Sequence, residues 1–323
     1  MEQVQAERIE ILVLVDNVTD SLSTTPSFVT REWNVLRKRG MSMLSGAGLC
    51  CANHGLALLI TVHGKQGTRR VLFDGGPVDY AIARNGQKLG VDFGAIDAIV
   101  LSHGHWDHAG GLPSALRLMG EAGRRDVKLH LHPDMFHQRG SLQSDGGVLP
   151  MDRVPAPEEW AAMGACPIVT RAAGTCLDGM VFVSGEIPRR TEYERGLPNQ
   201  VRQQPDGSWT PDTVLEDERF IAVDIQDRGV VVFTACSHAG VVNVLYHARA
   251  CFPDRPLFAV MGGFHLSGEN EAAIGATIAD LGGFGLSHVI PAHCTGWRAV
   301  AALAEKFGEP MVVPAAVGKH FSL

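Results

Sequence analysis

Short apolar runs of strand length recur along the whole chain. Most of them are rich in valine and isoleucine and end in glycine, aspartate or histidine. Runs of this length and composition are typical of buried β-strands. The pattern predicts strands over residues 9–17, 56–62, 70–76, 96–102, 127–133, 180–186, 219–225, 229–238, 257–266 and 288–294.

Helical patterns fall between these runs, mainly late in the chain. They predict helices over residues 113–122, 241–251, 269–282 and 297–307. Strands and helices alternate in the second half, whereas the first strands follow one another as hairpin-like pairs. Two sheets with helices on their outer faces suit this order. We therefore expect residues 1–323 to form a single α/β domain, a four-layer αββα sandwich.

One region departs from the pattern. Residues 135–215 are rich in glycine, proline and polar side chains and show little periodicity. Long irregular segments in compact domains are often functional loops. We interpret this region as an insertion or as long loops near the active site, and a disordered surface segment is the alternative.

Composition limits the possible partners and location. The chain carries a net charge of −7 and has no cluster of basic residues, which argues against nucleic acid or an anionic membrane as the main partner. The first ten residues lack a signal-peptide pattern, and no apolar run approaches the ~18 residues of a membrane span. Seven cysteines without a C-x-x-C motif favour reduced thiols. We expect a cytoplasmic protein with a small-molecule partner.

The segment LSHGHWDHAGG (101–111) follows one predicted strand directly and is too polar for a core. Alternate residues of an extended segment point the same way, so His103 and His105 can face one point. Asp107 and His108, beyond a turn, can face a neighbouring point. Imidazole and carboxylate groups suit zinc, iron or manganese. The segment predicts one or two bound divalent ions, zinc in the first place.

HGHWDH resembles the metal-binding signature of the metallo-β-lactamase superfamily. Other segments resemble a branch named for 7,8-dihydropterin-6-methyl-4-(β-D-ribofuranosyl)aminobenzene-5'-phosphate synthases. These segments are ANHGLALLI (52–60), LFDGG (72–76), SGEIPR (184–189), TACSHAGVVN (234–243), MGGFHL (261–266) and PAHCTG (291–296). The resemblance implies an αββα sandwich with a one- or two-metal site at one edge, and says little about the substrate.

The resemblance also implies a role for individual residues. The expected ligands of the first metal are His103, His105 and His238, and those of the second are Asp107, His108 and His293. Asp74 in LFDGG resembles the aspartate that orients the histidine cluster.

The chain departs from the family pattern at one point. Many relatives supply a bridging carboxylate after a strand, but the comparable strand here ends in Ala235-Cys236-Ser237-His238. Cys236 is either a soft substitute for that carboxylate or a small buried thiol. His265 also ends a predicted strand, and it is a ligand, a substrate-facing acid or a structural residue. We take Asp107 and His265 as the catalytic candidates.

Three further residues are candidates for substrate binding. His54 either faces the site from a loop or occupies a turn. Glu186 and Arg189 either bind a substrate anion or form a surface ion pair. The looser set of His130, His132 and His137 lacks an aspartate, and we interpret it as strand and turn residues.

These features favour a metal-dependent hydrolase in which a metal-activated water attacks a small ester, lactone or phosphoester. Asp107 would orient or deprotonate that water as well as bind metal. One alternative is a metal-dependent synthase acting on pterin and arylamine ribosyl phosphate substrates, as the branch resemblance implies. Another is a non-catalytic ligand-binding protein of the same fold. A di-iron redox protein is also conceivable, although no flavin-type or GxGxxG segment is evident.

Overall fold

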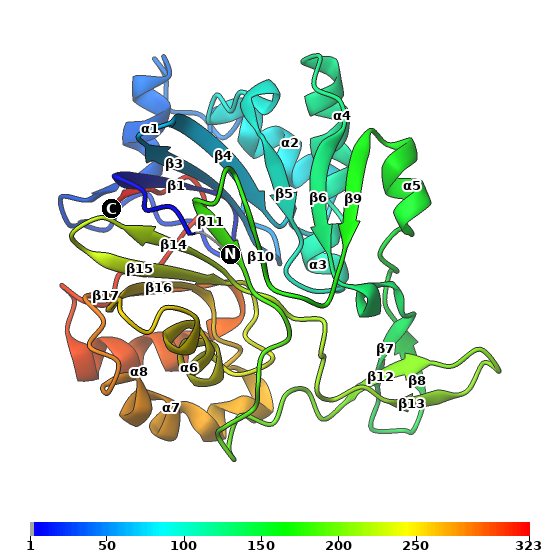
Figure 1. Ribbon diagram of the computed structural model, residues 1–323. Helices are drawn as coiled ribbons and strands as arrows, with labels where there is room; N and C mark the ends of the chain where they lie inside the picture. Colours follow the sequence, from blue (N-terminus) through cyan, green and yellow to red (C-terminus); the bar gives the residue numbers. More distant parts are fainter. Residues whose placement is uncertain (1–2) are drawn as a thin grey trace.

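Two large β-sheets pack against each other in the computed structural model, which describes residues 3–323 (Figure 1). The first sheet has eight strands in the order β2-β18-β1-β3-β4-β5-β6-β9, and the second has six in the order β10-β11-β14-β15-β16-β17. Helices cover the outer face of each sheet. This arrangement is the predicted αββα sandwich.

The first sheet comes mainly from the N-terminal half of the chain. Its strands are β1 (Arg8–Val15), β2 (Val29–Thr30), β3 (Ala57–Gly64), β4 (Gly67–Phe73), β5 (Ala98–Val100), β6 (Val127–Leu131), β9 (Ala165–Val169) and β18 (His320–Ser322). The helices beside it are α1 (Glu32–Lys38), α2 (Asp79–Lys88), α3 (Trp106–Ala109), α4 (Leu112–Glu121) and α5 (Pro157–Ala162), with the short 3-10 helices η1 (Phe93–Ala95) and η2 (Pro133–Phe136). Strands β4, β5, β6 and β9 run parallel.

The second sheet comes from the C-terminal half. Its strands are β10 (Gly174–Cys176), β11 (Val181–Val183), β14 (Ile221–Ile225), β15 (Gly229–Thr234), β16 (Leu257–Gly263) and β17 (His288–Ala292). Its helices are α6 (Val241–Cys251), α7 (Ile274–Leu281) and α8 (Trp297–Phe307), with η3 (Gly268–Ala273) and η4 (His293–Thr295). Strands β15, β16 and β17 run parallel, so their carboxyl ends meet at one edge.

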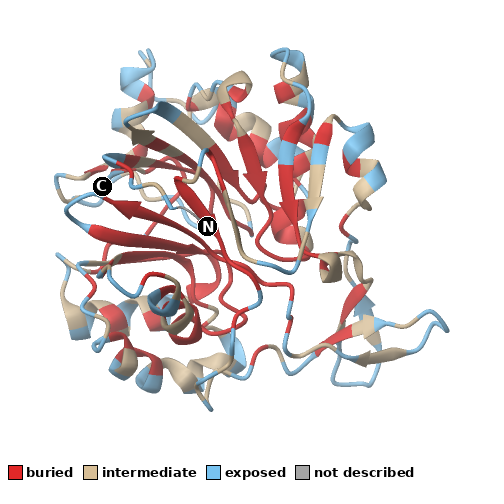
Figure 2. Cartoon of the chain, in the orientation of Figure 1, coloured by how far each residue is buried: buried red, intermediate tan, exposed pale blue. Residues whose placement is uncertain are grey.

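The core has three apolar layers (Figure 2). Side chains of strand β1 contribute to two of these layers. Ile11 and Val13 pack between the sheets, whereas Leu12 and Leu14 pack toward the helices. Because strand side chains alternate, both faces of this strand are apolar and buried. This explains the uninterrupted apolar run over Ile11–Val15 in this strand.

The region 135–215 contains more regular structure than its composition predicts. Strands β9, β10 and β11 belong to the two main sheets. The remaining strands form a small separate sheet that projects from the sandwich (Figure 1). These strands, in the order β13-β12-β7-β8, are β7 (Arg139–Leu142), β8 (Val148–Pro150), β12 (Gln200–Gln203) and β13 (Trp209–Pro211). Strands of three or four residues are too short to give a clear periodic pattern.

Two other findings concern the sequence-based expectations. Across the described residues, the helices all fall short of the length and apolarity that crossing a bilayer requires. The seven cysteines are free rather than paired in disulfides.

Candidate metal centre

Polar residues follow the parallel strands of both sheets at one edge of the sandwich. His103 follows β5, and His238, His265 and His293 follow β15, β16 and β17. Four residues at this edge have positive φ angles: His265 (45°), His293 (46°), Asp74 (61°) and Ser237 (53°). Such strained backbone is uncommon outside glycine and tends to gather at functional sites. The sharp turns direct these side chains across the edge.

The first group of donors contains three buried histidines from the two sheets. The Nε2 atom of His103 lies 3.0 Å from Nδ1 of His105 and 3.1 Å from Nε2 of His238. Three nitrogens bound to one zinc at about 2.0–2.1 Å would lie about 3.3 Å apart in a tetrahedral site. The spacing of this group therefore fits a single small cation.

The second group surrounds the Asp107 carboxylate. Its Oδ2 atom lies 3.3 Å from Nε2 of His293, 3.7 Å from Nε2 of His108 and 3.4 Å from Nε2 of His54. The structure thus brings together all six residues that the sequence suggests as ligands, in two adjacent groups. His54, suggested as a substrate contact, joins the second group.

Asp74 fixes the proton positions of two of these histidines. Its buried carboxylate accepts hydrogen bonds from the Ser102 backbone N–H at 2.7 Å and the Ser102 hydroxyl at 2.8 Å. Since that hydroxyl donates to Asp74, its oxygen accepts from Nδ1 of His103 at 2.9 Å. Asp74 also lies 2.7 Å from Nδ1 of His108. In both rings a proton sits on Nδ1, so Nε2 is the nitrogen that faces the other donor groups.

Asn17, just past β1, orients two more histidines and was not suggested by the sequence. Its Oδ1 atom accepts from the Gly55 N–H at 3.0 Å and from Nδ1 of His293 at 2.8 Å. Its amide nitrogen lies 3.2 Å from Nδ1 of His54. His293 therefore presents a free Nε2 lone pair to Asp107, whereas neutral His54 presents an N–H. Only the fold reveals this, because 37 residues separate Asn17 from His54 and 276 separate it from His293.

The electrostatics differ between the two groups. Burial, assisted by neighbouring cationic groups, lowers the pKa of His105 to about 3 and those of His103 and His238 well below their usual value. Burial also opposes the charged form of His108, but the Asp107 and Asp74 carboxylates outweigh it and raise its pKa to about 9. The first group therefore offers neutral imidazoles, and the second attracts positive charge.

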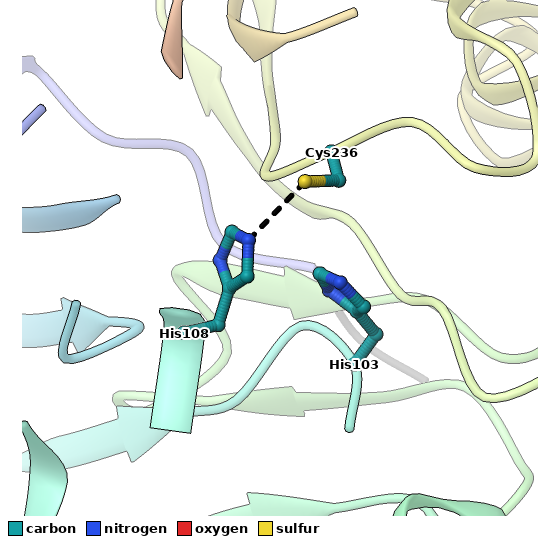
Figure 3. A group of neighbouring side chains, drawn as sticks. All are labelled: His103, His108 and Cys236. Atoms are coloured by element: carbon teal, nitrogen blue, oxygen red, sulfur yellow. Dashed lines mark hydrogen bonds between the residues drawn. The ribbon is translucent and has the colours of Figure 1, made fainter. Parts of the chain in front are cut away.

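Cys236, which the sequence analysis considered as a soft substitute for a bridging carboxylate, stands beside the histidines. Its buried Sγ atom lies 3.2 Å from Nε2 of His108, as the dashed line in Figure 3 marks. Cys236, His103 and His108 form a group whose donor atoms lie within 4.8 Å of one another. The sulfur also lies 3.4 Å from Sγ of Cys294.

Both groups border a cleft with an empty volume of about 810 Å³. His54, His105, Asp107, His238, His265 and His293 line it from the sandwich. Met151, Leu197 and Gln200 line it from the region 135–215. This region therefore contributes directly to the walls of the cleft.

Glu186 and Arg189 lie elsewhere. They line a neighbouring cavity with an empty volume of about 680 Å³ rather than the cleft over the histidines. The Arg189 guanidinium donates to the backbone oxygens of His238, at 2.6 Å, and Val214. Glu186 pairs with Arg171 at 2.8 Å. These contacts support the loops around the site, and the cleft lining includes neither residue.

The looser histidine set lies outside the cleft lining as well. His130 is the fourth residue of β6. His132 precedes η2 and accepts a hydrogen bond from the Asp134 backbone N–H at 3.2 Å, which caps that short helix. These two residues have the strand and turn positions expected of them.

Asp217 and Glu218 connect the two ligand-bearing turns, and the sequence analysis did not single them out. Asp217 accepts from the Gly104 N–H at 2.8 Å. Glu218 accepts from the His238 N–H at 2.7 Å and the Ala239 N–H at 2.6 Å. Both acids are buried. Their signal in the sequence is a pair of adjacent acids, LEDERF (215–220), directly before a buried strand.

Comparisons with known proteins agree with this geometry. Residues 53–171 match the family model of the metallo-beta-lactamase superfamily. The chain is 27% identical over 260 residues to the 7,8-dihydropterin-6-methyl-4-(beta-D-ribofuranosyl)-aminobenzene-5'-phosphate synthase of Methanocaldococcus jannaschii, covering 80% of this chain and 86% of the relative.

Two solved structures show the same fold. Tm1679, described as a metal-dependent hydrolase of the beta-lactamase superfamily, superposes with a TM-score of 0.71 and 23% identity over 98% of both chains. The metallo-beta-lactamase fold protein YhfI of Bacillus subtilis gives a TM-score of 0.51 and 11% identity over 98% of this chain and all of its own. These two likenesses show that the chain has the metallo-β-lactamase fold, and residues 53–171 are the part of it that matches the superfamily model.

Proposed function

We propose that the protein is a metal-dependent hydrolase of a small ester, lactone or phosphoester. The observation that carries the proposal is the meeting of six nitrogen and oxygen donors from both sheets beside one cleft. His105, Asp107, His238 and His293 line this cleft, and His103 and His108 are buried behind them. Divalent ions bound there, zinc or alternatively iron or manganese, would polarise the scissile group and lower the pKa of a water molecule toward about 7.

The residues divide the work between them. His103, His105 and His238 would hold one ion through neutral imidazoles. Asp107, His108 and His293 would hold the other, and Asp107 would also orient the attacking water. The water oxygen would bond to the carbonyl carbon or phosphorus, the bond to the leaving oxygen would break, and a proton from the water would pass to that oxygen. The His54 N–H, directed toward Asp107, steadies that carboxylate or contacts the substrate.

Replacing one ligand tests the proposal. His105→Ala removes one of three nitrogens of the first group, so we expect loss of bound metal and at least a 100-fold fall in turnover. The matched control is His63→Ala, on β3, whose imidazole pairs with Glu10 and lies outside the cleft lining. Elemental analysis and a screen of phosphodiesters, lactones and thioesters provide the measurements. A metal-free variant that kept its turnover would overturn the proposal.

A synthase is the second candidate, and the 27% identity to a named synthase over most of both chains favours it. The cleft lining contains neither lysine nor arginine. A phosphate group of a substrate would therefore have to be bound by the ions and the histidines. Incubation with a pterin diphosphate and an arylamine ribosyl phosphate separates the candidates, because a synthase joins the two and the product mass reveals it.

A further inference from the structure

A second kind of donor cluster adjoins the histidines. Cys236, His265 and Cys294 offer two sulfurs and one ring nitrogen, all within 4.8 Å of one another. We refer to these three residues as the sulfur cluster. They follow β15, β16 and β17, which are neighbours in the second sheet. The same parallel edge that presents His238 and His293 thus presents a sulfur-rich set beside them.

The polar atoms of this cluster differ in their partners. The Cys294 S–H donates to the Cys236 backbone oxygen at 3.6 Å, and Cys236 Sγ lies 3.2 Å from Nε2 of His108. The Nδ1 atom of His265 is buried and accepts no hydrogen bond from, and donates none to, any residue in the range 3–323. Each sulfur is buried, and the two lie 3.4 Å apart. A buried polar nitrogen without a partner is costly and calls for an explanation such as an ion.

The backbone is shaped to bring these donors together. A Cβ atom at Gly263 would lie 2.3 Å from the Ala235 oxygen and 2.6 Å from the Cys294 sulfur. Only glycine permits this close approach between β16 and the sulfur. Two residues later, His265 takes the strained φ of 45°. The end of β16 is therefore built to pass close to Cys294 and then turn the imidazole toward it.

We propose that the sulfur cluster is a third cation site, specific for a thiophilic divalent ion such as Zn²⁺ or Cd²⁺. Binding replaces two S–H protons with two metal–sulfur bonds and releases two protons to solvent, with no change of oxidation state. The two thiolates neutralise the ion, and His265 supplies a neutral nitrogen. All three residues line the cleft, so the fourth position is open to water or substrate.

This proposal gives His265 the role of a ligand in place of the catalytic role suggested by the sequence. It also gives Cys236 a role as a metal ligand, at the strand end where the sequence offers no bridging carboxylate. Cys236 belongs both to the sulfur cluster and to the group with His103 and His108, so its sulfur connects the new site to the histidine groups. Soft sulfur donors select Zn²⁺ or Cd²⁺ over Mn²⁺, whereas Asp107 and the histidines accept all of these ions.

The test uses chelator-treated full-length protein titrated with Cd²⁺. We expect a thiolate-to-cadmium absorption band in the ultraviolet that saturates with the added ion. Peptide mass spectrometry after alkylation should show Cys236 and Cys294 protected in the loaded protein. Cys294→Ser should weaken the band and the Cd²⁺ affinity at least tenfold. The matched control Cys166→Ser changes an exposed cysteine and should leave both unchanged.

Two further measurements keep the test decisive. If Cys294→Ser fails to fold, His265→Gln retains both thiols and should still lower the affinity for Cd²⁺. Saturation of the wild-type protein with Cd²⁺ without the band and without thiol protection would overturn the proposal. His105→Ala should keep the band, because it alters only the first histidine group. The cadmium band and thiol protection therefore test the sulfur site, whereas the metal content and turnover of His105→Ala test the hydrolase proposal.

Discussion

The Asp74 carboxylate orients one histidine in each of the two donor groups. Asp74 holds the Nδ1 proton of His108 directly and that of His103 through Ser102. In Asp74→Asn, an NH₂ group replaces one acceptor oxygen. Either the Ser102 backbone N–H at Oδ1 loses its acceptor, or the Ser102 hydroxyl and His108 at Oδ2 do. We expect the affinity for Zn²⁺ to fall about 10–100-fold, as is usual for the partners of metal-bound histidines.

Competition with a chelator of known affinity measures this change. Asp97→Asn is the matched control. Asp97 directly precedes β5, whereas His103 follows that strand, and the Asp97 carboxylate accepts from the Arg70 backbone N–H. An unchanged Zn²⁺ affinity in Asp74→Asn would contradict the orienting role.

The pKa of His108 predicts how the metal-free protein responds to pH. Its folded-state pKa is raised to about 9, above the unfolded value near 6.5. The folded state therefore binds this proton more tightly. The resulting stability is complete below pH ~6.5 and is lost as the pH rises to about 9. We expect the free energy of unfolding to fall by on the order of 2–3 kcal/mol over this window.

Urea unfolding of chelator-treated protein at several pH values measures this loss. In His108→Gln the decline between pH 6.5 and 9 should flatten, because the titrating group is gone. A decline of the same size in His108→Gln would assign it to other groups. Below pH 6.5 the trend reverses, because His105, with its lowered pKa, must be protonated as the pH falls toward about 3.

The segment before β14 joins the two ligand-bearing turns. Glu218→Ala leaves the backbone N–H groups of His238 and Ala239 buried without an acceptor. Each such group costs about 1–3 kcal/mol, so we expect a loss of stability of about 2–5 kcal/mol and weaker binding of the first ion. Urea unfolding and isothermal titration with Zn²⁺ measure the two effects. Glu216→Ala, an exposed neighbour, is the control and should change neither.

Elements with a clear apolar pattern could be predicted from the sequence, and elements without one could not. Every apolar run interpreted as a strand overlaps a strand of the two main sheets. Helix α2 was missed because its buried face consists of Ala81, Ile82, Asn85 and Gly86, of which only Ile82 is strongly apolar. A helix whose packing depends on small and polar side chains gives little periodic signal.

The site residues likewise include some that could be predicted from the sequence and some that could not. The HGHWDH segment is local, so its chemistry is visible in the sequence. The family resemblance suggested His238 and His293, and their positions at the ends of predicted strands supported that choice. The roles of Asn17, Glu218 and Arg189 depend on contacts between segments far apart in the chain. Arg189 shows the difficulty best, because an arginine near a site suggests an anion, whereas here it binds backbone oxygens.

The C-terminal strand ties the chain ends into one sheet. Strand β18 lies between β1 and β2, and Phe321 is fully buried in the central core. Phe321→Ala should lower the free energy of unfolding by about 3–5 kcal/mol. The metal content of the folded protein should not change, because Phe321 lies outside the cleft lining. Ser322→Ala, which alters an exposed neighbour, is the control for both measurements.

The division of donors between the two sheets has a consequence for biosynthesis. A ribosome releases His103, His105, Asp107 and His108 long before it has made His238 and His293. During that interval the nascent chain has only part of each donor group. The donor set of both proposed ions is complete only after β17 has joined the second sheet. If the proposed function holds, we therefore expect metal loading to be completed after synthesis.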